Sequence, residues 1–347
     1  MTSRPSRVPS LARCGFALAA AALACGAAFA QPSPWRLQIT ADPYVDFMPA
    51  AINDRGALAG RVHAVNAAVK RGRHVSEFVY GEALAINNRG QAVGSTFDTG
   101  AQVAAMWGPF GAVMPLNTEG IASWAEDIND RGEVVGTTQI GTNERRATVW
   151  HRGTVTYLGF GFGHGVNNDG VVVGAFYDNS RPPRAALWKD GQITFLGRDT
   201  IYAASLAYAI NDAGQAVGND SSSAVLWQDG EPVYLDNSGM ALDINAGGDI
   251  VGYRSAWPAI EERAMLWQAQ SGAGHVAIDV NTLLRPGAAE AGWVLTRAGS
   301  INRDGEIVGI ALNRALCQDP VNPVCFWYAF VLTRSRWPDE YPVPAPP

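Results

Sequence analysis

The side chains best placed to do chemistry stand in a short motif that recurs along the chain. In it, Asn is usually followed by Asp or Asn and, two residues later, by Gly. Such oxygens suggest calcium, which takes about six oxygen ligands, usually with several carboxylates. No further acids follow at alternate spacing, so we interpret the motif as a turn and expect no metal site. Its second position holds Asp54, Asn88, Asp130, Asn168, Asp212, Ala246 and Arg303.

Other catalytic patterns are not evident. There is no Gly-x-Ser-x-Gly elbow and no phosphate-binding glycine loop. Acids such as Glu144, Glu261 and Glu262 fall in predicted loops, where we expect solvated surface. We therefore predict that the chain is not an enzyme and needs no cofactor. The histidines show no fixed place in the repeat and are interpreted as surface residues: His63, His74, His151, His164 and His275.

The turn motif belongs to an internal repeat. An apolar residue precedes each Asn, Gly follows three residues after it, and a second Gly follows four residues later. Asn can hydrogen-bond the turn backbone, and Gly accepts the left-handed conformation that ends a tight hairpin. We predict a hairpin at each motif, with the second Gly marking a bulge or a close approach of backbones. The structural turn residues are Asn53, Asn87, Asn129, Asn167, Asn211, Asn245 and Asn302.

A second hairpin follows each motif. Its first strand ends in Trp at positions 107, 150, 188, 227 and 267, and Val69 and Leu332 are expected to take that place in the first and last repeats. Trp at a fixed strand position indicates core. Each unit then has four short strands, and the spacing of 34 to 57 residues between successive Asn is typical of a β-propeller blade.

The two ends of the chain are expected to share a blade. Residues 35–39 read as an isolated strand before the first hairpin, and the last repeat lacks its fourth strand because prolines follow it. We predict an all-β fold over residues 35–334: a seven-bladed β-propeller of four-stranded antiparallel blades, closed by the N-terminal strand. A β-solenoid is the alternative.

The N-terminal 30 residues have the pattern of a secretory signal peptide. Arg4, Arg7 and Arg13 precede a short apolar run that ends in Ala-Phe-Ala, so we expect cleavage after Ala30 and a periplasmic or secreted protein without a transmembrane segment. In that compartment Cys317 and Cys325 are predicted to form a disulfide. Residues 335–347 read as a Pro-rich disordered tail.

The composition limits the class of partner. The chain has 347 residues, 47% of them hydrophobic, which is enough to bury a large core. Its net charge is −6, and its 26 basic residues form no long run, so we expect no nucleic-acid partner. We expect a monomer.

The whole predicted repeat region resembles the HAF-repeat family of predicted extracellular proteins. The resemblance rests on the Ile-Asn-Asp-x-Gly-x-Val-Val-Gly unit followed by a tryptophan strand, and on the segment Asp-Val-Asn-Thr-Leu-Leu at residues 279–284. The His-Ala-Phe that names the family is mostly replaced by Arg-Ala. The resemblance implies an exported repeat protein and carries over no catalytic residues.

Function is expected in the loops that vary between blades. Two sets of loops should share one face of the ring, where Arg and aromatic residues gather, and such a patch suits an acidic or sugar-like ligand. We therefore expect a non-catalytic protein that binds a protein or glycan partner in the cell envelope. The alternatives are a glycan-active lyase or hydrolase with paired acids at the tunnel mouth, and a structural envelope protein. The candidate binding residues are Arg146, Arg184, Arg263, Trp257 and Trp293.

Overall fold

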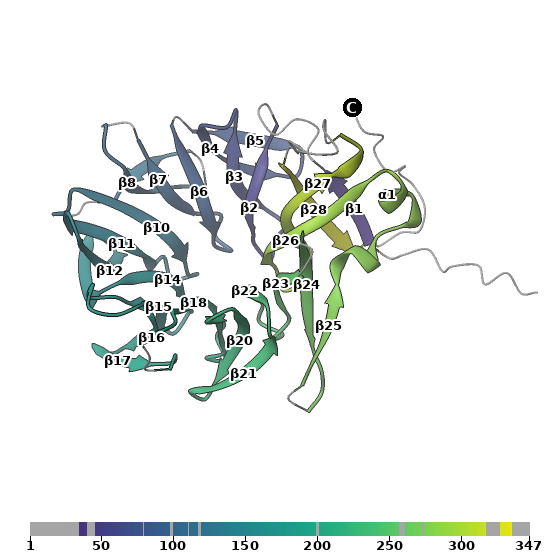
Figure 1. Ribbon diagram of the computed structural model, residues 1–347. Coiled ribbons are helices and arrows are strands. Elements are labelled where there is room, and N and C mark those ends of the chain that lie inside the picture. Colours follow the sequence, from purple (N-terminus) through teal and green to yellow (C-terminus); the bar gives the residue numbers. More distant parts are fainter. Residues whose placement is uncertain are drawn as a thin grey trace, which may run out of the picture. The chain divides into compact units, whose positions relative to one another are not determined.

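The protein is a seven-bladed β-propeller, as predicted. Its computed structural model describes residues 35–39, 46–78, 80–97, 100–109, 111–116, 119–198, 201–256, 261–272, 274–316 and 327–334. These residues form seven antiparallel sheets of four strands each. The innermost strands of the seven sheets surround a common centre (Figure 1). Strand follows strand in sequence order within six of the seven sheets.

The first three blades come from the first half of the chain. Blade 1 contains β2 (Met48–Ile52), β3 (Leu58–Val62), β4 (Asn66–Arg71) and β5 (His74–Glu77). Blade 2 contains β6 (Gly81–Ile86), β7 (Ala92–Thr96), β8 (Val103–Trp107) and β9 (Val113–Pro115). Blade 3 contains β10 (Ala122–Ile128), β11 (Val134–Gly141), β12 (Glu144–His151) and β13 (Thr154–Phe160).

Three further blades follow with the same order. Blade 4 contains β14 (Phe162–Val166), β15 (Val172–Phe176), β16 (Arg184–Lys189) and β17 (Gln192–Phe195). Blade 5 contains β18 (Ser205–Ile210), β19 (Ala216–Asp220), β20 (Ser223–Gln228) and β21 (Glu231–Asp236). Blade 6 contains β22 (Gly239–Ile244), β23 (Ile250–Ala256), β24 (Glu261–Ala269) and β25 (His275–Asp279).

Blade 7 joins the two ends of the described chain. Its strands are β26 (Trp293–Ile301), β27 (Ile307–Asn313), β28 (Trp327–Arg334) and β1 (Trp35–Ile39), with β1 pairing antiparallel to β28. The predicted closure by the N-terminal strand is confirmed. Three short helices lie beside this blade in sequence: η1 (Val280–Leu283), α1 (Pro286–Glu290) and η2 (Arg314–Leu316).

The core lies between neighbouring blades. The five tryptophans that end the third strands of blades 2 to 6 are at most 4% exposed and pack against small and β-branched residues. The expectation that Val69 takes this place in blade 1 is wrong by one residue. Lys70 pairs with Leu58 as Trp150 pairs with Val134, and Val69 points into the core on the other side of the strand.

Several predictions concern residues outside the described ranges. These are the signal peptide, the disulfide between Cys317 and Cys325, the tail after residue 334, and Trp257. Among the described residues, no helix combines the length and apolar character needed to cross a membrane.

Candidate functional site

The seven turn asparagines form a closed ring at one end of the central channel. Each side-chain amide donates a hydrogen bond to the backbone carbonyl of the corresponding Asn in the next blade, over distances of 2.8 to 3.2 Å. Asn302 donates to Asn53 and closes the circle. All seven side chains are 2–6% exposed. The ring therefore connects every blade to its neighbour.

Each Asn also builds its own turn. In blade 1 the Asn53 Oδ1 accepts hydrogen bonds from the backbone N–H groups of Arg55 and Ala57, at 3.0 and 2.9 Å. Gly56 adopts a φ of +70°, and the corresponding Gly of every other motif lies between +77° and +84°. The buried amide thus accepts hydrogen bonds within its own turn and donates one to the next blade, as burial of such a group requires.

The second motif position forms another, incomplete ring. The Asn88 backbone N–H donates to Asp130 Oδ1, and the Asp130 N–H donates to Asn168 Oδ1 in the following blade. Asp and Asn alternate from blade 1 to blade 5, so that amides face carboxylates and charge repulsion is avoided. The sequence breaks at Ala246, which offers no acceptor.

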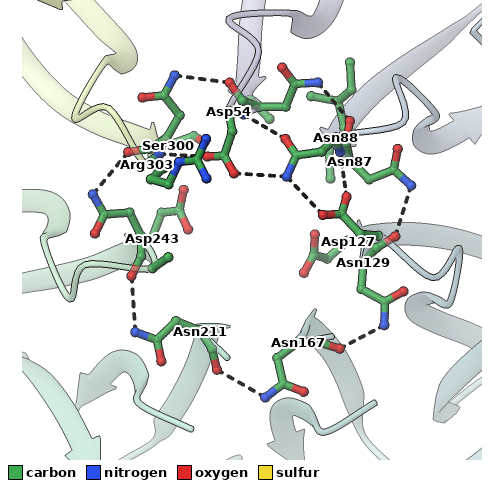
Figure 2. A pocket seen from close by; sticks show the side chains of 18 of the residues that line it. Asp54, Asn87, Asn88, Asp127, Asn129, Asn167, Asn211, Asp243, Ser300 and Arg303 are labelled. Atoms are coloured by element: carbon green, nitrogen blue, oxygen red, sulfur yellow. Dashed lines mark hydrogen bonds between the residues drawn. The ribbon is translucent and has the colours of Figure 1, made fainter. Parts of the chain in front are cut away.

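Two acids beside the Asn ring connect neighbouring blades through hydrogen bonds. Asp127 accepts from the N–H of Val166 in the next blade at 2.9 Å, and Asp243 accepts from the N–H of Ile301 at 2.9 Å. Burial raises the pKa of Asp127, and burial raises that of Asp243 to about 6. They stand on opposite sides of a cavity of about 230 Å³ (Figure 2). Ser300 occupies the same position in blade 7 and accepts from Ile52.

The second Gly of each motif permits a bulge in the innermost strand. A Cβ on Gly136 would lie 2.1 Å from the carbonyl oxygen of Trp124, and the other six blades show the same approach at 1.9 to 2.0 Å. The register of each innermost strand shifts opposite this Gly. The residue left over, three before each turn Asn, defines a bulge position, and these are Ala50, Leu84, Glu126, His164, Tyr208, Leu242 and Gly299.

Three consecutive blades carry reactive side chains at the bulge position. Glu126, His164 and Tyr208 come from β10, β14 and β18, which line the same channel. Burial and the nearby carboxylates of Glu82 and Asp127 raise the pKa of Glu126 to about 7. Among the described residues, none forms a hydrogen bond to its carboxyl group. Burial lowers the pKa of His164 to about 4, so its ring is neutral near pH 7.

A row of four rings leads outward from these residues. The His164 ring lies 5.6 Å from that of Tyr208 and 6.2 Å from that of Phe162, measured between centroids. Phe162 stacks at 6.2 Å on Tyr177. All four side chains are half-buried. Among the described residues, the buried Nε2 atom of His164 has no hydrogen-bond partner, and the Tyr208 hydroxyl contacts the sulfur of Met240 at 3.7 Å. We name Tyr208, His164, Phe162 and Tyr177 the aromatic row.

One cation stands over this row. The Arg145 guanidinium lies 5.8 Å from the Phe162 ring centroid, and its buried Nε has no hydrogen-bond partner within the described ranges. No ion pair joins Arg145 to another residue in the described part of the chain. A guanidinium with unused donors beside an aromatic face is suited to a carboxylate-bearing ligand.

A cavity of about 370 Å³ lies at the outer end of the row. Tyr177, Arg181 and Arg184 contribute to its lining together with Phe195. The Arg184 guanidinium is fixed there, since its Nε donates to the carbonyl of Gly197 at 2.7 Å and its charge lies 4.3 Å from the Phe195 ring. Among the predicted binding residues that the structure describes, Arg184 is the one that adjoins the aromatic row.

The other predicted binding residues that lie within the described ranges are not gathered at one site. Arg146 pairs with Glu144 in its own strand, and Arg263 lies 3.9 Å from Asp279 in blade 6. Trp293 is 4% exposed and packs edge-on against Tyr328, so it contributes to the core of blade 7.

The interpretation of all five histidines as surface residues is wrong for His164, which projects from a bulge toward the channel. Sequence reasoning did not single out Glu126 or Tyr208 either. A signal was present, because all three stand three residues before a turn Asn. This signal can be interpreted only once the position of the bulge is known. In the described residues, no three His, Cys, Asp or Glu side chains are grouped as metal ligands.

Comparison with known proteins shows the fold alone. No protein family and no curated protein matches the chain in sequence. A catalytically inactive mutant of virginiamycin B lyase from Staphylococcus aureus, solved with quinupristin, is similar in structure, with a TM-score of 0.54 and 12% identity over 86% of this chain and 99% of that one. The selenomethionine form of that lyase gives a TM-score of 0.55 at 13% identity over the same shares. A puromycin hydrolase mutant gives 0.50 at 14% identity, over 82% of this chain and 53% of that one.

Proposed function

We propose that the protein is an exported propeller of the HAF-repeat type that binds an acidic glycan at the mouth of its central channel. The single observation that carries the proposal is the aromatic row beneath Arg145. Sugar rings stack on aromatic faces of this size, and successive rings 5.6 to 6.2 Å apart offer a continuous surface to a chain of sugars.

The charge of the ligand follows from the cations. Arg145 has no ion pair with another described residue, whereas Arg146, Arg254 and Arg263 are each close to an acid. An unpaired guanidinium contributes binding energy to a carboxylate without first breaking an internal pair. A neutral glycan would leave that guanidinium unused. Uronic acids carry a carboxylate on each sugar, and two cations lie beside the row: Arg145 over Phe162, and Arg184 in the cavity that Tyr177 also lines.

The place of action is proposed from the N-terminal pattern. The basic and apolar segments of residues 1–30 are those of a secretory signal. An exported protein meets the acidic polysaccharides of the cell envelope and its surroundings. The disulfide proposed between Cys317 and Cys325 fits the same compartment.

Calorimetric titration with polygalacturonate, alginate and neutral dextran tests the proposal. We expect binding of at least one acidic polymer and none of dextran. Arg145→Gln should weaken that binding by about tenfold or more, since a charge-assisted contact contributes about 1.5–3 kcal/mol. Arg89→Gln is the matched control, because Arg89 is exposed at the turn end of blade 2. Equal binding of dextran, or an Arg145→Gln variant that binds normally, would contradict the proposal.

A further inference from the structure

We propose that Glu126 and Glu82 cleave the bound glycan by hydrolysis, with Glu126 as the acid that protonates the glycosidic oxygen and Glu82 as the base that activates water. This inference rests on the glycan binding proposed above and adds a reaction to it. It concerns residues that belong to two neighbouring blades and face the same channel.

The backbone places the two residues on the innermost strands of neighbouring blades, β6 and β10, which contact each other. Glu126 occupies the bulge position of β10, and Glu82 stands five residues before the turn Asn of β6, one level further from the Asn ring. Their charges interact, since Glu82 is one of the groups that disfavour ionisation of Glu126. Cleavage of a glycosidic bond uses such a pair, with one carboxyl group protonated and the other ionised.

The surroundings separate the roles of the two acids. Glu126 is half-buried, and its carboxyl group has no hydrogen-bond partner among the described residues, which favours the neutral acid. Glu82 is 43% exposed, and its carboxyl oxygen lies 3.7 Å from the Arg61 guanidinium. Two carboxyl groups in contrasting environments are the usual arrangement of a general acid and a general base.

The other acids of the channel are occupied by structural contacts. Asp127 and Asp243 each accept two backbone N–H groups, one of them from the next blade. Glu126 makes no such bond to a described residue. Its neighbour His164 presents a buried Nε2 without a partner among the described residues, and such an atom could bond a polar group of a ligand in this part of the channel.

The chemical step balances without any further reactant than water. The Glu126 carboxyl gives its proton to the glycosidic oxygen while the bond from that oxygen to the anomeric carbon breaks. Water attacks the anomeric carbon and gives a proton to the Glu82 carboxylate. The products are a free hydroxyl and a hemiacetal, and proton exchange with solvent restores both acids. His164 and Phe162 carry the sugar next to the reacting bond.

The test measures binding and cleavage on the same samples. The protein is incubated with polygalacturonate and with alginate, and new reducing ends are counted together with ultraviolet absorption from unsaturated sugars. We expect reducing ends without unsaturation. Glu126→Gln and Glu82→Gln should each lower the rate by about 10²- to 10⁴-fold while calorimetric binding is retained. Glu231→Gln, an exposed acid of β21, should leave it unchanged.

The outcomes separate this inference from the proposed function. Binding without new reducing ends would overturn hydrolysis and leave glycan binding intact, whereas loss of all binding in the unmodified protein would remove both. Unsaturated products would show elimination instead of hydrolysis. Cleavage that persists in Glu126→Gln would also overturn the assignment. Retained binding in the variants serves as the check that they are folded.

Discussion

The side-chain amide of Asn302 donates a hydrogen bond to the backbone carbonyl of Asn53, which stands 249 residues earlier in the chain. The same bond recurs between every pair of adjacent blades. The motif that makes a local turn is thus also the motif that joins the ring. Local and long-range structure depend on one side chain.

Asn167→Ala should therefore destabilise the protein strongly. The change leaves the N–H groups of Asp169 and Val171 and the carbonyl of Asn211 without their partners. Each such loss costs about 1–3 kcal/mol when the group is buried, so we expect a decrease of roughly 3–5 kcal/mol in the free energy of unfolding. Denaturant titration measures it. Asn237→Ala, at an exposed position between β21 and β22, should change it little.

Ala246→Asn should stabilise the protein. The alternation of Asp and Asn at the second motif position places an Asn after Asp212, and Ala246 interrupts it. The new amide can accept from the Asp212 N–H and donate to its carboxylate, for a gain of about 1 kcal/mol. The same change at Ala213, one residue beyond Asp212 and exposed, is the control. A lower melting temperature for Ala246→Asn alone would show that the second ring has no energetic role.

The pH dependence of stability should report Glu126. Its pKa is raised to about 7, so the folded protein keeps a proton that the unfolded chain has lost. Stability from this group is therefore lost as the pH rises from about 4.5 to 7. The free energy of unfolding of Glu126→Gln should therefore increase relative to that of the unmodified protein across this interval, by on the order of 2 kcal/mol at pH 8. Thermal unfolding at pH 5 and pH 8 measures the difference, and Glu231→Gln should show none.

The rate of the proposed cleavage should depend on the same protonation of Glu126. Glu126 can protonate a leaving group only while it is neutral, so the rate should fall above a pH of about 7. The carboxylates of Glu82 and Asp127 and the neutral ring of His164 surround it. A rate that rises through this interval would show that another group supplies the proton.

Gly136→Ala tests the bulge itself. The added Cβ would lie 2.1 Å from the Trp124 carbonyl oxygen, so the two strands must separate or the bulge must disappear. We expect a loss of roughly 3 kcal/mol or more, comparable to overpacking of a core. Gly274→Ala, where an added Cβ meets no atom within 4 Å, is the control. Normal stability of Gly136→Ala would mean that the close approach relaxes at little cost.

The fold could be predicted because each repeat contains the residues that determine its strands and turns. The spacing of Asn, Gly and Trp specifies four strands and two turns in each blade, and the isolated strand at residues 35–39 specifies the closure. One place was misjudged by a single residue. In blade 1, Lys70 stands where other blades have Trp, and the apolar Val69 beside it is buried on the opposite face.

The site could not be predicted in the same way, because a bulge changes the face on which a side chain lies. Simple alternation from Ala125 would not bring both Glu126 and Asp127 to the channel, yet the extra residue does. The bulge is also the reason why the orientation of His164 and Tyr208 could not be predicted. The partner of Arg263, Asp279, also lies on a neighbouring strand, which no local pattern reveals.

The pairing of β1 with β28 sets the order in which the molecule can be completed. Ile39 pairs with Phe330, a residue synthesised about 290 positions later. At roughly 5–20 residues per second, the first strand waits on the order of 15 to 60 seconds for its partner. The ring therefore cannot close before the C-terminal strand β28 has been made.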